Sequence, residues 1–311
     1  MRIEKKVPMN NARRSVGKSS VVRLTDKKDS VNRAMIYAHW DEQGLVDDHV
    51  LYSLEKYRPW VSNLVFVSTN YKRKCRRLEQ LCDRVLTREN TGFDFASWKA
   101  GLGVIDVSKY QEVVFSNSSI YGPFQPMESV FARTKETSAD LWGMTISEEH
   151  KERHLQTYFF AMKKRVLLSE AAKRFWDDVG PFQEQRDVIE LFEMRLLKEL
   201  ELERFRVSAF FDGAKSLQIP WREKLVNLVR HPKKIRQSRA YLKACRHRPY
   251  NPTHLQWRQC VDAGVPFLKV DLLRDNPNHL RLGPVFRWVQ ENTKYPLDLM
   301  KRNLSRIKRT N

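Results

Sequence analysis

The chain has 311 residues, of which 41% are hydrophobic and 11% aromatic, a composition that excludes collagen-like and low-complexity architectures. This length is enough for one large domain or two modest ones with a sizeable core. The apolar runs are far shorter than the ~20 residues that cross a bilayer. The first twenty residues also lack the apolar stretch of a secretory signal, so we expect a cytoplasmic protein.

The net charge of +20 is concentrated in three blocks of the sequence. Residues 1–33 carry a net +7, residues 222–248 a net +9 and residues 299–311 a net +5, so the remainder is nearly neutral. Such blocks suit a polyanion, either nucleic acid or an anionic membrane surface, although a merely basic soluble surface gives the same pattern. The four cysteines form no CxxC pair, which argues for free thiols rather than a zinc site.

In chain order we expect a disordered basic tail (1–33), an α/β core (34–215) and a basic helical C-terminal region (216–311) with a core-packing segment at 253–275. In the core, apolar runs alternate with segments of helical spacing, which predicts a mostly parallel central sheet flanked by helices. The predicted strands are 34–38, 61–69, 84–87 and 112–116, and the predicted helices are 46–57, 72–82 and 93–103. Ligands of such sheets bind beyond the carboxyl ends of the strands, which directs attention to 39–48, 88–94 and 117–123.

Beyond residue 140 the pattern is less regular. We expect strands at 139–146 and 155–162, amphipathic helices at 166–179 and 187–202, and basic helices within 216–248. Residues 253–275 are predicted to form a helix, a Gly-Val-Pro turn and a short buried strand.

Five sequence segments resemble one protein family. GFDFASWKAGL, VVFSNSSIYGPF, ADLWGMTIS, HLQTYFFAMKKRVLLS and NPTHLQWRQCVDAGVPFLKVDLL are similar to the rhamnan synthesis F (RgpF-like) glycosyltransferases, from about residue 34 to about residue 275. The resemblance implies a GT-A-like, Rossmann-like fold. It also implies transfer of a sugar, rhamnose by family analogy, from a nucleoside diphosphate donor such as dTDP-rhamnose to a lipid-linked polysaccharide or O-antigen acceptor.

The same resemblance gives the basic blocks a role at a membrane. The acceptor would be held at the inner face of the bacterial cytoplasmic membrane, whose anionic lipids attract each Lys or Arg with ~1 kcal/mol. Residues 222–248 and 302–309 could then dock the enzyme as a peripheral protein. Leu297, Met300 and Leu304 recur at helical spacing, as in an interfacial helix, although a solvated helix end fits equally well.

The donor site implied by the resemblance follows the predicted strand ends. Its candidate residues are His39, Asp41, Asn90, Gly92, Asp94, Lys99, Asn117, Ser118 and Ser119. The family pattern has an Asp where this chain has Ser118, so dependence on Mg²⁺ or Mn²⁺ is in doubt, and Asn117 and Ser119 would be the ligands of any metal there. Otherwise another acid binds the metal, or cationic side chains neutralise the leaving diphosphate. Several of these residues also have a possible structural role without a ligand. Asn117 and Ser119 would then cap a turn, His39 and Asp41 would face water, and Asp94 would only complement a helix dipole.

If the anomeric centre inverts, sugar transfer also needs a carboxylate base for the acceptor hydroxyl. Glu193 is the favoured candidate, with Glu190 and Asp140 as alternatives and with Glu149 and His154 as weaker ones. Tyr121 and Trp142 could stack on sugar rings, although core packing is the commoner role of a Trp. The rival functions are a non-catalytic family member that scaffolds glycan assembly and a basic nucleic-acid-binding protein, although no nucleic-acid-binding motif is visible.

Overall fold

The structure is a computed structural model that describes residues 31–149, 152–213, 215, 219–228, 235–246 and 251–308. Most of the expected basic tail, residues 1–30, lies outside the described residues, as do parts of the 222–248 and 299–311 blocks. The first strand begins at Arg33, one residue inside the expected tail. The Arg33 side chain is buried and pairs with the buried carboxylate of Glu112.

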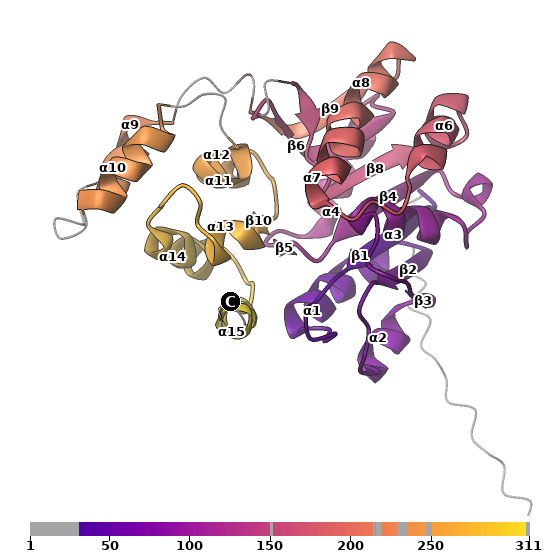
Figure 1. Ribbon diagram of the computed structural model, residues 1–311, viewed down its shortest axis with the longest axis horizontal. Helices are drawn as coiled ribbons and strands as arrows, with labels where there is room; N and C mark the ends of the chain where they lie inside the picture. The colour runs from indigo at the N-terminus through magenta and orange to yellow at the C-terminus, as the bar shows by residue number, and fades with distance from the viewer. Residues whose placement is uncertain are drawn as a thin grey trace, which may run out of the picture.

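An eight-stranded mixed sheet forms the centre of the molecule (Figure 1). Its strands are β1 (Arg33–His39), β2 (Asn63–Ser68), β3 (Arg84–Thr87), β4 (Glu112–Asn117), β6 (Leu141–Ser147), β7 (His154–Leu155), β8 (Phe159–Lys163) and β9 (Val207–Asp212). They run in the order β3-β2-β1-β4-β8-β6, with β7 and β9 both beside β6. β8 and β7 are antiparallel to their neighbours, and the other pairs are parallel. The predicted α/β class, with a mostly parallel central sheet flanked by helices, is confirmed.

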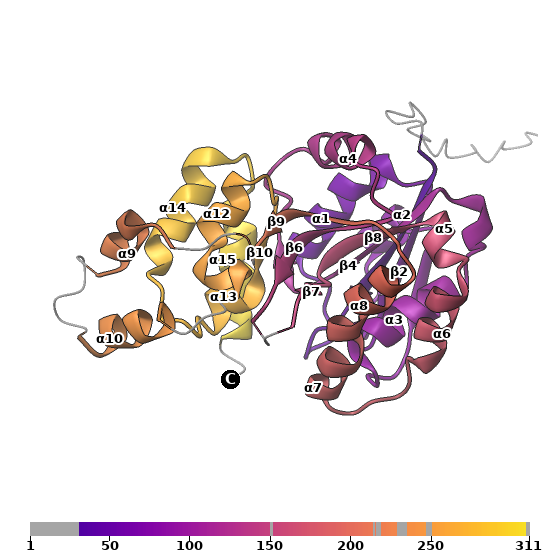
Figure 2. The ribbon, with the colours of Figure 1, turned by 90° about the horizontal axis from the view of Figure 1, so that it is seen from above.

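Helices cover both faces of this sheet, which explains why β1 and β4 read as continuous apolar runs (Figure 2). Side chains alternate between faces along a strand. Met35 and Tyr37 of β1 pack in the cluster under α1 (Asp48–Tyr57), α2 (Arg76–Leu81) and α4 (Met127–Glu136). Ala34 and Ile36 pack on the opposite side, under α3 (Phe93–Leu102), α6 (Glu170–Asp178) and α8 (Met194–Leu202).

The C-terminal part adds a third apolar cluster beside the sheet. Its elements are α11 (Pro252–Leu255), α12 (Trp257–Asp262), β10 (Leu268–Lys269), α13 (Val270–Arg274), α14 (Leu282–Asn292) and α15 (Leu297–Ile307). β10 pairs antiparallel with β5 (Ile120–Tyr121), directly after the polar end of β4. The helices α9 (Trp221–Leu228) and α10 (Ile235–Ala244) lie at the far end of this part, away from the sheet (Figures 1 and 2).

The structure corrects several predicted elements. The single strand expected at 155–162 is two strands, β7 and β8, because residues 156–158 leave the sheet. The helix expected at 166–179 is split into α5 (Lys164–Leu167) and α6, because the Ser169 hydroxyl caps the start of α6 by accepting from the Ala172 N–H. The helix expected at 187–202 is α7 (Gln185–Val188), a π-helical turn (Ile189–Glu193) and α8. No strand was expected for β9 and no helix for α4 or α14.

The interfacial-helix interpretation of the C-terminal stripe is also corrected. Met300 and Leu304 of α15 are buried in the third cluster, where α15 contacts α1, α13 and α14. The stripe therefore belongs to the core and is not available to lipid. Within the described part of the chain, every helix is too short or too polar to traverse a bilayer.

Candidate functional site

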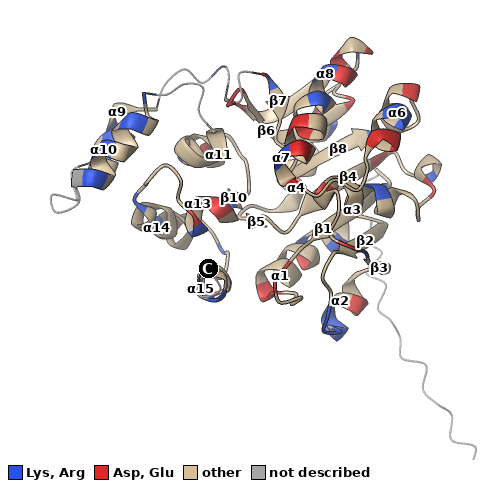
Figure 3. Cartoon of the chain, in the orientation of Figure 1, with Lys and Arg blue, Asp and Glu red and all other residues tan. Residues whose placement is uncertain are grey.

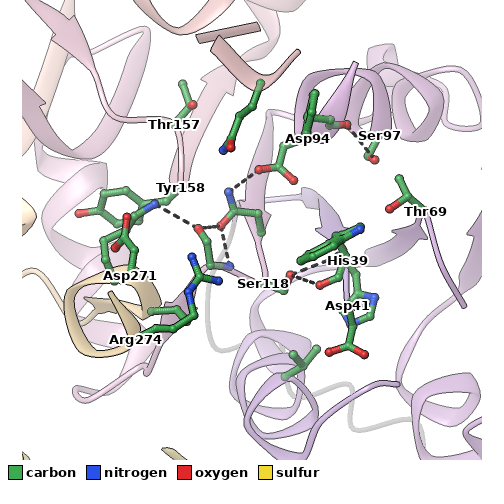
Figure 4. Close-up of a pocket in the computed structure, with 18 of the residues that line it drawn as sticks. His39, Asp41, Thr69, Asp94, Ser97, Ser118, Thr157, Tyr158, Asp271 and Arg274 are labelled. Atoms are coloured by element: carbon green, nitrogen blue, oxygen red, sulfur yellow. Dashed lines mark hydrogen bonds between the residues drawn. The ribbon is translucent and has the colours of Figure 1, made fainter. Parts of the chain in front are cut away.

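A cavity of about 780 Å³ lies at the carboxyl ends of β1 and β4. The strand ends supply His39–Asp41 and Asn117–Ser119, and α3 supplies Asp94. The opposite wall comes from β10, α13 and α15, and the connection between β7 and β8 closes a third side. Figure 4 shows side chains from these distant segments converging on one space.

The end of β4 presents a connected set of polar side chains (Figure 4). The Asn117 amide donates to Asp94 Oδ2 at 2.8 Å, and Asn117 Oδ1 accepts from the backbone N–H and the hydroxyl of Ser119, at 3.2 and 2.6 Å. These bonds fix the side chain of Asn117 between α3 and the turn after β4. Asn117 therefore does cap the turn after β4, as the alternative interpretation expected. The same residue also lines the cavity.

Lys269 approaches the same turn from β10. Its Nζ donates to Ser119 Oγ at 3.2 Å and lies 5.3 Å from the centre of the Tyr158 ring. Two residues on, Asp271 Oδ1 lies 3.1 Å from Nε2 of the buried His254. Burial alone would raise the pKa of Asp271, but the charge of Lys269 and the hydrogen bond with His254 hold it well below its usual range. Asp271 is therefore ionised at neutral pH.

Two further carboxyl groups face the cavity. Burial raises the pKa of Asp94 to about 6, against the opposing effects of the Asn117 amide and the Lys269 charge, and the nearby Glu193 carboxylate raises it further. Glu193, at the end of the π-helical turn, accepts from the Thr157 hydroxyl at 3.2 Å. A π-helical turn is a common feature of functional sites, because it re-aims side chains within a helix.

The end of β1 is built around Asp41. Its Oδ1 accepts from the backbone N–H groups of Gln43 and Leu45, both at 3.0 Å, and its Oδ2 pairs with Arg306 of α15. Arg306 also contacts Asp47 Oδ2 at 2.6 Å. Burial opposes ionisation of Asp41, but the hydrogen bond from Arg306 and that from Leu45 keep its pKa below the ordinary value.

His39 lies just before this turn and has a different environment. Its Nδ1 is 2.9 Å from the Ser68 hydroxyl, and its ring lies 5.0 Å from the Phe66 ring. Burial lowers the pKa of His39 to about 4, and the charge of Asp41 only partly offsets this. The imidazole is therefore neutral at pH 7 and offers a hydrogen bond rather than a charge.

The cavity brings together most of the donor residues predicted from the sequence. Those that line it are His39, Asp41, Asn90, Asp94, Asn117, Ser118 and Ser119, together with the predicted base Glu193 and the weaker candidates Glu149 and His154. They come from six separate segments of the chain. Their proximity follows from the parallel sheet, which places the ends of β1 and β4 at one edge.

Two predicted donor residues lie behind the cavity wall. Gly92 has a φ of 70° before the first turn of α3, and its N–H donates to the Phe182 carbonyl at 2.6 Å. Only glycine suits this position, because a Cβ there would collide with the Gly180 carbonyl oxygen. Lys99 donates to the carbonyls of Asp177 and Val179, at 3.1 and 2.9 Å. Both residues hold α3 in place, and neither lines the cavity.

Two predicted catalytic acids also lie elsewhere. Glu190 is exposed and pairs with Arg186 at 2.8 Å. Asp140 is buried before the first residue of β6, which runs parallel to β4, so it lies at the opposite edge of the sheet from Asn117. There it accepts from the Arg206 backbone N–H at 2.9 Å.

The two predicted sugar-stacking rings are part of the core. Tyr121 is fully buried, and its hydroxyl donates to Asn303. Trp142 is 1% exposed, and its Nε1 donates to Glu112 at 3.1 Å. Neither ring has a face open to a sugar. Trp40, which the sequence analysis did not single out, lines the cavity and is 49% exposed.

Sequence reasoning also missed several charged or polar cavity residues of the C-terminal part: Lys269, Asp271, Arg274, Asn303 and Arg306. One signal for them was available, since Lys269 and Asp271 follow the predicted buried strand within 253–275. The sequence does not, however, indicate which strand pairs with this one, because β10 pairs with β5, about 150 residues earlier in the chain.

The cavity residues do not fit a divalent-cation site of the Asp-x-Asp kind. The end of β4 offers an amide oxygen and two hydroxyls, and the Asn117 oxygen already accepts two bonds from Ser119. The Lys269 ammonium is bonded to the same turn, where it would repel a metal ion. Among the described residues, no three His, Cys, Asp or Glu side chains are grouped to hold a metal.

Comparison with known proteins places the chain in a family. The model of the family described as rhamnan synthesis protein F matches residues 62–223. The chain belongs to this rhamnan synthesis protein F family. The matched segment runs from β2 into α9 and therefore includes α3, the polar end of β4 and Glu193.

Two curated relatives accompany the family match. The virulence protein VirA of Vibrio anguillarum is 29% identical over 202 residues, which are 63% of this chain and 64% of that protein. The uncharacterized protein y4gN of Sinorhizobium fredii is 26% identical over 140 residues, which are 43% of this chain and 37% of that protein. This family member thus spans less than two thirds of the length of the relatives that it matches.

Solved structures similar to this family member include enzymes of nucleotide sugars. Glucosyl-3-phosphoglycerate synthase of Mycobacterium tuberculosis, in a complex with Mn²⁺, UDP and phosphoglyceric acid, is 14% identical with a TM-score of 0.39 and covers 71% of this chain and 80% of its own. A structure described as a nucleotide-diphospho-sugar transferase from Desulfovibrio desulfuricans G20 is 13% identical with a TM-score of 0.38 and covers 66% and 90%. TM-scores this low add nothing to the topology described above.

Proposed function

We propose that this chain is a glycosyltransferase that uses a nucleoside-diphosphate sugar bound in the cavity at the ends of β1 and β4. One observation carries the proposal: the polar turn Asn117–Ser119 lies at the carboxyl edge of a parallel sheet, inside a cavity of about 780 Å³, in a member of the rhamnan synthesis protein F family. Cavities of this size and position bind ligands as large as a nucleotide sugar.

The proposed donor lies with its nucleoside at the end of β1 and its diphosphate at the end of β4. His39 and Asp41 would bond the base or ribose, since a neutral imidazole and an ionised carboxylate offer complementary hydrogen-bond groups. The exposed ring of Trp40 offers a face for stacking. Asn117 and the two following serines would face the diphosphate.

Glu193 is the proposed catalytic base. It lines the cavity, whereas Glu190 and Asp140 do not. In the reaction, the acceptor hydroxyl oxygen forms a bond to the anomeric carbon, and the bond from that carbon to the diphosphate oxygen breaks. The nucleoside diphosphate leaves with the electron pair, and the hydroxyl proton passes to the Glu193 carboxylate.

The finer identity of the substrates follows only by family analogy. The proposed donor is dTDP-rhamnose, and the proposed acceptor is a lipid-linked polysaccharide or O-antigen precursor at the inner face of the bacterial cytoplasmic membrane. The family match supports the choice of sugar and acceptor. The basic character of α9 and α10 supports the place at a membrane; these helices carry Arg222, Lys224, Arg236, Arg239 and Lys243. In this proposal residues 34–215 are the transferase core, residues 1–33 are a basic tail and residues 216–311 are a basic C-terminal region.

The function is tested by substituting Glu193→Gln and measuring donor binding and sugar transfer separately. We expect binding of dTDP and UDP to be retained, because the charge is removed without a change of shape. Transfer should fall by about 10²–10⁴-fold, the usual contribution of a general base. Glu190→Gln is the matched control, because Glu190 is exposed on the same helical segment, and it should transfer like the wild type.

Failure of the wild-type protein to bind any nucleoside diphosphate or its sugars would contradict the proposal. The substitution of the expected Asp by Ser118 favours one alternative, a non-catalytic family member that scaffolds glycan assembly. That alternative predicts donor binding with no transfer by the wild-type protein to any lipid-linked glycan, in EDTA as well as in Mn²⁺.

A further inference from the structure

We propose that Lys269, together with Arg274, supplies the positive charge against the donor diphosphate that a divalent cation would otherwise supply. This inference rests on the proposed function and adds a consequence to it: the chain binds nucleoside diphosphates without metal. Because the turn after β4 does not fit a metal ion, the positive charge comes from these two residues of the C-terminal part.

The position of Lys269 is fixed by the backbone around it. β10 pairs with β5 so that Lys269 is opposite Ile120, and the Val270 N–H donates to the Ser119 carbonyl at 2.8 Å. The ladder therefore attaches Lys269 to the turn that would face the diphosphate. From this position its ammonium donates a hydrogen bond to the Ser119 hydroxyl at 3.2 Å.

Arg274 lies at the end of α13, five residues after Lys269, the last residue of β10. Its Nε and Nη2 each lie 2.8 Å from a carboxylate oxygen of Asp275, which orients the guanidinium group. In Figure 4 the Arg274 side chain extends from α13 toward the end of β4. An oriented guanidinium group suits phosphate oxygens, because its planar set of donors can bond two of them at once.

Three carboxylates of the cavity wall, those of Asp94, Glu193 and Asp271, each accept a hydrogen bond from another group of the protein. Asp94 accepts from the Asn117 amide, Glu193 from the Thr157 hydroxyl, and Asp271 from the Leu272 backbone N–H beside His254. A metal ion bound near these groups and the end of β4 would lie close to the Lys269 ammonium, which would repel it. The same arrangement suits an anion instead, because the Lys269 ammonium is positively charged and has three N–H donors, of which one goes to Ser119 Oγ.

The first test measures the binding of dTDP and UDP to the full chain by titration calorimetry, in EDTA and in Mn²⁺ or Mg²⁺. We expect the dissociation constants in EDTA and in metal to agree within about twofold. This measurement uses the wild-type protein and so does not depend on the folding of a variant.

The second test substitutes Lys269→Met, with Lys269→Arg and Lys301→Met for comparison. Loss of a charged hydrogen bond corresponds to about 10–150-fold in affinity, so Lys269→Met should weaken dTDP binding by at least tenfold and Mn²⁺ should not restore it. Lys269→Arg keeps the charge and should stay within about fivefold of the wild type. Lys301 is exposed on α15 outside the cavity, so Lys301→Met should bind like the wild type.

The outcomes separate this inference from the proposed function. Binding that is lost in EDTA and recovered in Mn²⁺ overturns the inference and leaves the glycosyltransferase proposal standing. Wild-type affinity in a folded Lys269→Met protein overturns the inference as well. Absence of nucleoside-diphosphate binding under every condition overturns both.

Discussion

At the scale of single residues, Asp94 shows how the site acts on the stability of the protein. Its carboxyl group has a pKa of about 6 in the folded protein, mainly because of burial, against an ordinary value of 3.8. The unfolded chain therefore loses this proton at a lower pH than the folded protein does. Between about pH 4 and pH 6 the folded protein holds more protons, so the free energy of unfolding falls as the pH rises.

This difference predicts the effect of Asp94→Asn. Asn cannot ionise and keeps the shape of the protonated acid, so the variant should be more stable than the wild type at pH 8. The gap in melting temperature should shrink as the pH falls from about 6 toward 4.5. The buried His39, whose pKa is lowered to about 4, titrates in both proteins and therefore cancels in the comparison. A gap that is constant over this pH range would contradict the raised pKa.

Residues differ in how far the sequence alone could place them. His39, Asp41 and Asn117 were predicted because each follows a buried apolar run, and the ends of parallel strands share one edge of a sheet. Lys269 and Arg306 were not, because they reach the cavity through contacts with residues about 150 and 265 positions away. Local pattern carries no information about contacts of that range.

At the scale of elements, α15 is the clearest departure from expectation. Its apolar residues recur at helical spacing between basic ones, a pattern shared by interfacial helices and by helices packed on a core. In the structure α15 packs on the core: Met300 and Leu304 are buried, and Arg306 lines the cavity. The strands β1 to β4 were predicted to within two residues of their observed bounds, whereas β9 was missed and the strand expected at 155–162 is broken at 156–158.

The packing of α15 predicts a large effect of Met300→Ala. Removing a fully buried Met side chain should lower the free energy of unfolding by about 2–5 kcal/mol. Ser305→Ala on the exposed side of the same helix should change it by less than ~0.5 kcal/mol. Denaturant titration measures both. Equal and small effects would indicate that the α15 stripe is not packed in the core.

At the scale of the whole molecule, charge is distributed unevenly (Figure 3). The helices α9 and α10 are rich in Arg and Lys and lie at the far end from β3, whereas α1 and α6 each carry more acidic than basic residues. Trp221 and Leu225 of α9 are exposed, 65% and 42% respectively. Basic residues beside exposed apolar ones suit the surface of an anionic bilayer.

This distribution predicts binding to vesicles. The full chain should sediment with vesicles containing phosphatidylglycerol, and binding should weaken as salt is raised. Reversal of three α10 charges, Arg236→Glu, Arg239→Glu and Lys243→Glu, should weaken binding by at least tenfold, at ~1 kcal/mol for each cation lost. The control reverses three exposed cations near α2, Lys72→Glu, Arg73→Glu and Lys74→Glu. Equal loss in both variants would show that only net charge matters.

The ion pair between Arg306 and Asp41 has a consequence for the folding of this protein as it is translated. The two residues are 265 positions apart, so a ribosome completes the whole sheet before it adds the residue that finishes the cavity wall. Until then Asp41 and Asp47 face each other without their shared counter-ion. The proposed donor site is therefore complete only after α15 has docked.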